Sequence, residues 1–160
     1  MLMVILYVAH TLALGGWFGA QIYSVLIVQR HPAQDEDPEY FEDFATRMAH
    51  GTRYTLLAVI GVMLPTWVLI VVLRAGDSAE LGAVWPWLVT VKSAAILATI
   101  GLFVYLSWHV WPQRIFALRD ELPAVRRRFF GLSIGILSAA GFALAVGIVE
   151  QSMGSFLVGT

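Results

Sequence analysis

Four long apolar stretches take up more than half of this 160-residue chain, and each is long enough to cross a lipid bilayer. A membrane helix needs about 20 mostly apolar residues to cross a hydrocarbon core about 30 Å thick. Backbone polar groups in lipid must be satisfied within the segment itself, so each stretch is predicted to be a helix. The chain is therefore predicted to be an all-α membrane protein with one transmembrane domain, residues 1–160. The predicted spans are Leu2–Val28, Tyr54–Leu73, Val84–Val110 and Phe130–Val149.

The composition excludes several classes of protein. The chain is 59% hydrophobic and 13% charged, which is outside the range of soluble domains. It has no cysteine, so disulfides, iron–sulfur clusters and thiolate metal sites are excluded. A net charge of −1 gives no indication of a nucleic-acid partner. The first residues, MLMVILYVAH, have no basic region and no cleavage site, so they are predicted to begin the first span.

The basic residues predict the orientation of the bundle. Eight arginines lie in the first and third loops, whereas the second loop has only Arg74. Basic loops face the cytoplasm, so both termini are predicted to lie outside, in the periplasm of a bacterial inner membrane. Short connections make neighbouring spans antiparallel, which predicts an up-down-up-down four-helix bundle. The eight arginines are Arg30, Arg47, Arg53, Arg114, Arg119, Arg126, Arg127 and Arg128.

The loops and spans have local signals of their own. Pro32–Pro38 is acidic and rich in turn formers, and is predicted to be a solvated linker. Glu39–His50 has apolar residues at helical spacing, which predicts a short amphipathic helix on the cytoplasmic membrane surface. Pro65 is predicted to kink the second span. Close helix packing is predicted at three pairs of small residues, namely Gly15 and Gly19, Gly131 and Gly135, and Gly141 and Ala145.

The four histidines lie at two levels of the membrane. At 1.5 Å per residue, His10 lies about 12 Å below the outer end of the first span, and about 25 Å separates it from His109 along the membrane normal. One metal or haem iron therefore cannot lie between His10 and His109. His31 and His50 share the cytoplasmic level of His109. On depth alone, His50 and His109 are the best pair for a cofactor.

The surroundings of His50 suit a b-type haem. Arg47, His50 and Arg53 recur every three residues and are predicted to share a face, so the arginines would meet the haem propionates. A copper or zinc site formed by His31, His50 and His109 is an alternative. In the ordinary interpretation, these side chains bind lipid phosphate at the headgroup level.

His10 and Lys92 lie deeper in the bilayer. No Asp or Glu falls within a predicted span, so neither residue is expected to have a carboxylate partner at its depth. Lys92 can extend its ammonium group to the outer interface, whereas His10 is too short and must face the bundle interior. His10 then contacts a ligand or makes an internal hydrogen bond. Met63, at a similar depth, either completes a His/Met site or packs in the core.

The stretch from His10 through Trp17, Phe18, Gly19 and Tyr23 to His31 resembles the first span of the HemJ-type protoporphyrinogen oxidases. That family is a small helical bundle that binds b-type haem, and the resemblance implies a role for His10. Where the family has a Pro-Arg pair after the tyrosine, this chain has Val25 and Leu26. If the protein is an enzyme, the resemblance implies an oxidoreductase.

The third span is similar to the copper-resistance D domain, with an early lysine, a long apolar run and a proline, here Lys92 and Pro112. That resemblance implies copper movement or an accessory redox role. The sequence hypothesis is a haem-binding redox protein of the inner membrane. The alternatives are a copper-handling protein and a non-catalytic subunit that docks to other membrane subunits of a respiratory or photosynthetic complex.

Overall fold

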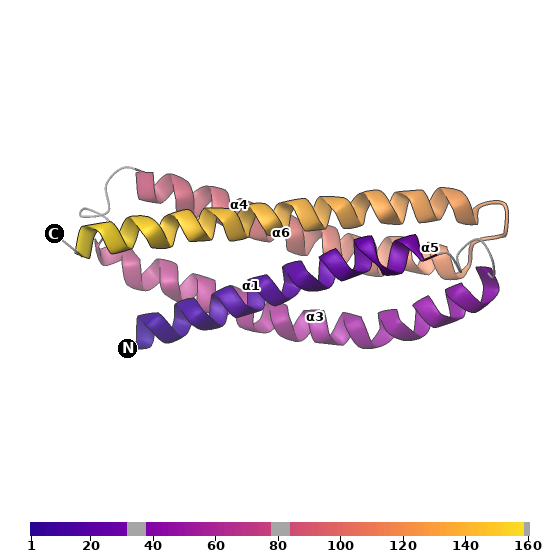
Figure 1. Cartoon of the computed structure of the whole chain (residues 1–160), viewed down its shortest axis with the longest axis horizontal. Coiled ribbons are helices and arrows are strands. Elements are labelled where there is room, and N and C mark those ends of the chain that lie inside the picture. Colours follow the sequence, from indigo (N-terminus) through magenta and orange to yellow (C-terminus); the bar gives the residue numbers. More distant parts are fainter. Residues whose placement is uncertain (32–37, 78–83, 159–160) are drawn as a thin grey trace.

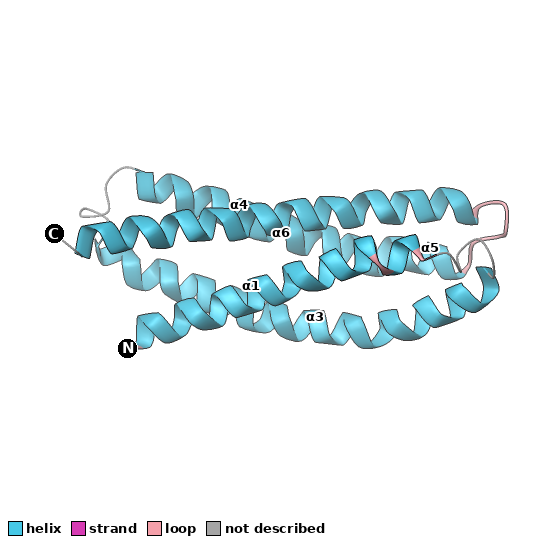
Figure 2. Ribbon diagram, viewed as in Figure 1, coloured by secondary structure: helices cyan, strands magenta, loops and turns pink. Residues whose placement is uncertain are grey.

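The computed structural model describes residues 1–31, 38–77 and 84–158, and nearly all of these residues are helical (Figure 2). No strand occurs in these ranges, which confirms the all-α prediction. The long helices are α1 (Leu2–Leu26), α3 (Pro38–Arg74), α4 (Val84–Tyr105) and α6 (Leu122–Val158). The short ones are η1 (Val28–Arg30), η2 (Ala75–Asp77), the π-helical segment η3 (Leu106–Val110) and α5 (Trp111–Ile115).

The long helices lie side by side in an elongated bundle (Figure 1). The start of α1 and the end of α6 lie at one end of the bundle, called here the terminal end, together with η2 (Figure 1). The opposite end, which carries Arg30, Arg114 and Arg126, is called the basic end. Helix α1 packs against α3 and α6, and α4 packs against α6. Within the described residues, four helices are long and apolar enough to cross a bilayer, so the protein is a multi-pass membrane protein.

Helix α3 is longer than the predicted second span. The segment predicted as a separate surface helix, Glu39–His50, is helical, but it is continuous with the span. Phe41 and Ala45 are buried in a cluster with Trp111, which holds this segment against the bundle instead of laying it on the membrane. The helix also continues through Pro65.

An ion-pair network holds the basic end of α3. The Glu42 carboxylate accepts hydrogen bonds from Arg114, at 2.7 Å from Nε, and from Arg126, at 2.8 Å from one terminal nitrogen. Arg114 and Arg126 belong to α5 and α6. A single carboxylate therefore connects three helices where they leave the apolar region.

The predicted glycine contacts are confirmed only on α6. A Cβ atom on Gly141 would lie 2.9 Å from the Phe18 ring, and one on Gly135 would lie 3.5 Å from the Leu102 side chain. These two glycines therefore permit close helix packing. The prediction is wrong for three others, where an added Cβ would meet nothing within 4 Å, namely Gly15, Gly19 and Gly131.

Helix α6 corrects the predicted fourth span. It begins at Leu122 and ends at Val158, whereas the predicted span covered only Phe130–Val149. Pro123 stands in the first turn of the helix, where proline is tolerated, and no other proline interrupts it. The extension carries Glu150 into a membrane-spanning helix, so the expectation that no acidic residue lies within a span was wrong.

Candidate functional site

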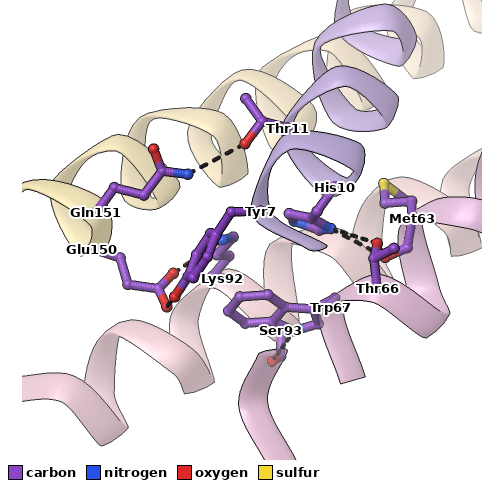
Figure 3. Close-up of polar contacts among 10 residues, drawn as sticks. All are labelled: Tyr7, His10, Thr11, Met63, Thr66, Trp67, Lys92, Ser93, Glu150 and Gln151. Carbon is purple, nitrogen blue, oxygen red and sulfur yellow. Dashed lines mark hydrogen bonds and ion pairs between the residues drawn. The ribbon is translucent and has the colours of Figure 1, made fainter. Parts of the chain in front are cut away.

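A buried ion pair joins α4 to α6 near the terminal end. Lys92 Nζ lies 3.0 Å from a Glu150 carboxylate oxygen, and the two side chains are 2% and 1% exposed. Helix α4 begins at the terminal end and α6 ends there. Lys92, near the start of α4, and Glu150, near the end of α6, therefore lie at the same level of the bundle (Figure 3). Removing two charges from water is costly and is offset only by close pairing and further polar contacts.

Aromatic side chains supply those further contacts. Lys92 Nζ lies 3.9 Å from the centroid of the Trp67 ring, within the range of a cation–π interaction. The Tyr7 hydroxyl donates to the other Glu150 oxygen at 3.4 Å. The lysine also needs Gly147, because a Cβ there would lie 3.2 Å from Nζ. Three helices besides α6 thus converge on one carboxylate, directly or through Lys92.

His10 lies beside this pair and is 1% exposed. Its Nδ1 is 3.1 Å from the backbone carbonyl oxygen of Met63, and its ring stacks on Trp67 at a centroid distance of 5.4 Å. A carbonyl only accepts hydrogen bonds, so this contact requires the proton on Nδ1, and in the neutral ring Nε2 then keeps its lone pair. The Thr66 hydroxyl lies 3.4 Å from the same Nδ1. Nε2 is buried and has no hydrogen-bond partner among the described residues. Figure 3 shows the imidazole between Met63 and the Lys92 cluster.

The expectation for Lys92 needs correction. Lys92 was expected to extend its ammonium group to the outer interface, but it is buried and paired with Glu150. The sequence interpretation missed Glu150, Tyr7 and Trp67, although an intramembrane lysine is itself a signal that a counter-charge lies at its depth. His10 makes an internal hydrogen bond, which was one of its two alternatives, but its partner is a backbone carbonyl, and backbone acceptors are invisible in a sequence pattern.

The three histidines of the basic end are not gathered into a site. His31, His50 and His109 are all exposed; the rings of His31 and His109 stack on Phe41 and Tyr105, and the ring of His50 contacts Tyr54 edge-on. In the part of the chain that the structure describes, no group of three or more His, Cys, Asp or Glu residues is placed to hold a metal ion. The structure therefore offers no support for a three-histidine copper or zinc site.

The two arginines that flank His50 point in different directions. Arg47 is exposed and forms an ion pair with Asp43 at 2.7 Å. Arg53 reaches into the bundle, donates to the backbone carbonyl of Ser107 at 2.8 Å and lies over the Trp108 ring. The side chains of Arg47 and Arg53 therefore do not share the predicted common face with His50. Arg53 instead connects α3 to the π-helical segment η3.

A cavity of about 240 Å³ lies toward the basic end. Residues of all four long helices and of η1, η3 and α5 line it, including Gln21, Arg53, Leu56, Phe103 and Phe129. None of the residues that line it is a histidine. A haem iron in this cavity would have no imidazole ligand.

The fold defines a four-span helical membrane protein, and the Lys92–Glu150 pair beside His10 forms a buried ionisable cluster within it. No protein-family model, no curated protein and no solved structure matches the chain.

Proposed function

We propose that this protein is a redox protein of the bacterial inner membrane and that it binds b-type haem through His10. The observation that carries the proposal is the state of the imidazole: Nδ1 is fixed by a backbone carbonyl and Nε2 is buried without a partner. A metal-ligating histidine characteristically donates its other ring nitrogen to a carbonyl or carboxylate, which fixes the tautomer and the orientation of the ring. An unpartnered buried acceptor otherwise costs about 1–3 kcal/mol.

Haem accounts for this environment better than a bare copper ion does. Haem would bring the porphyrin nitrogens with it, so one nitrogen from the protein, Nε2 of His10, would be enough to hold it. A bare copper ion needs several ligands from the protein. His10 is the one histidine at its level, and the nearby carboxylate of Glu150 is engaged by Lys92. One available imidazole nitrogen therefore favours haem.

The residues around His10 exclude water from the imidazole. Met63 and Trp67, which are 0% and 4% exposed, enclose the imidazole, so a porphyrin can enter only when these side chains move. The Glu150 carboxylate offsets the Lys92 charge next to the imidazole, so a positively charged iron would not face an unpaired cation. Bound haem would supply one-electron transfer, which is the chemistry that the proposal requires.

An absorption spectrum of the purified protein, combined with metal analysis, tests the proposal. The expected result is a reduced-minus-oxidised α-band with iron bound in proportion to the protein. Copper without that band would contradict the haem proposal and favour the copper-handling alternative. Neither iron nor copper, after expression with sufficient haem, would contradict both and favour an accessory subunit.

A further inference from the structure

Both polar and apolar side chains line the cavity toward the basic end. Helix α3 leads away from the basic end and α4 leads toward it, so Arg53 and Ser107 lie farther from that end than Phe41 and Trp111. Gln21, on α1, lies on the same inner side as Arg53. Leu56 and Phe103 lie farther still from that end, so the inner part of the cavity places these apolar side chains next to the donors of Gln21 and Arg53.

The donors on the inner side retain capacity for a ligand. Gln21 is 6% exposed, and no hydrogen bond joins its amide to another residue in the described ranges. Arg53 donates to the Ser107 carbonyl but has no carboxylate partner in the described part of the chain. The other arginine of the cavity, Arg114, is neutralised by Glu42. A buried amide and an unneutralised guanidinium favour a group with acceptor oxygens.

The rest of the cavity suits an apolar body. Leu56, Phe103, Leu106 and Phe129 line it. The volume of about 240 Å³ is slightly below the range of about 300–1,000 Å³ usual for small-molecule sites. Tyr23 and Met48 also line the cavity and are 52% and 37% exposed. The cavity therefore opens at the side of the bundle, between α1 and α3. The cavity can therefore hold a head group and the start of a chain that continues into lipid.

We propose that this cavity binds a membrane amphiphile whose acceptor oxygens meet Arg53 and Gln21 and whose apolar body lies against Leu56, Phe103 and Phe129. Two kinds of membrane molecule share this chemistry, a fatty-acid carboxylate and a quinone. Because no histidine lines the cavity, the site is separate from His10 and does not depend on haem.

A photoactivatable fatty acid with a diazirine in its chain tests the site in the full-length protein in lipid nanodiscs. We expect cross-links to cavity residues, mapped by mass spectrometry, on Leu56, Phe103 or Phe129. Competition with excess lauric acid or decylubiquinone distinguishes the two sources. Loss of the cross-links with lauric acid alone indicates a carboxylate, loss with decylubiquinone alone indicates a quinone, and loss with both indicates a site that accepts either.

Two variants and a control test the head-group contact and the cavity itself. Gln21→Leu removes the amide without changing the volume greatly, and is expected to weaken binding about tenfold. Ala49→Phe fills the cavity and is expected to abolish the cross-links while the protein remains folded by circular dichroism. Gln113→Leu, an exposed glutamine on α5, is the matched control and should leave them unchanged. Cross-links confined to lipid-facing residues such as Val4 and Leu12, or cavity cross-links that neither competitor reduces, would overturn the proposal.

Discussion

Lys92 and Glu150 stand 58 positions apart in the chain and form an ion pair inside a membrane bundle. Each charge has further support, because Trp67 faces the ammonium group and Tyr7 donates to the carboxylate. Such a pair fixes the register of α4 against α6. It also places a polar cluster directly beside His10, within membrane-spanning helices whose other side chains are mostly apolar.

The ion pair predicts a marked difference between single and double replacement. Lys92→Met or Glu150→Leu alone leaves one buried charge without its partner and should lower the free energy of unfolding by about 3–5 kcal/mol. The double variant should recover most of that loss, because an apolar pair replaces two desolvated charges. Unfolding titrations in detergent measure all three. Additive losses in the double variant would show that the two residues act independently.

The Glu42 network predicts unequal effects at adjacent acidic residues. Glu42→Ala removes the shared acceptor of Arg114 and Arg126 and should cost about 1–3 kcal/mol of stability. Asp43→Ala removes an exposed pair with Arg47 and should cost about 0–1 kcal/mol. The same unfolding titration compares them. Equal losses would contradict the assignment of Glu42 as the residue that connects three helices.

Two glycines of α6 predict opposite effects on thermal stability. Gly141→Ala places a Cβ against the Phe18 ring and should destabilise the bundle by about 1–3 kcal/mol. Gly131→Ala meets nothing within 4 Å and should stabilise the helix by up to about 1 kcal/mol. Midpoints of thermal unfolding in detergent give the comparison. A stabilising Gly141→Ala would mean that α1 and α6 are farther apart than described.

The distribution of arginines predicts the orientation of the bundle in the membrane. Because the chain has no cysteine, single cysteines introduced at Gly76 and Asp120 are unique labels for the second and third loops. A membrane-impermeant maleimide added to intact spheroplasts should label Gly76→Cys and not Asp120→Cys. Labelling of Asp120→Cys alone would mean that the termini lie in the cytoplasm.

The helical architecture could be predicted from the sequence because bilayer thickness and hydrophobic runs determine it. The number of long helices and their antiparallel order follow from that constraint. Helix ends did not follow from it. The extensions of α3 and α6 depend on Phe41, Glu42 and Glu150 finding partners on other helices, and no local pattern specifies those partners.

The candidate site was only partly predictable. The helical rise per residue placed His10 and Lys92 at a similar depth, and the structure brings them into one cluster. The same counting favoured His50 and His109, whose rings are exposed, because depth says nothing about the direction of a side chain. The carbonyl of Met63 and the cavity beside Arg53 arise from packing between helices, which a single sequence does not encode locally.

The most direct test of the central claim is the haem spectrum of His10→Gly with and without free imidazole. We predict that His10→Gly loses the reduced α-band, that added imidazole restores it, and that His50→Ala and His109→Ala retain it. Imidazole rescue separates ligation from a general loss of folding. An α-band that persists in His10→Gly, or that disappears with His50→Ala or His109→Ala, would contradict the assignment of His10 as the haem ligand.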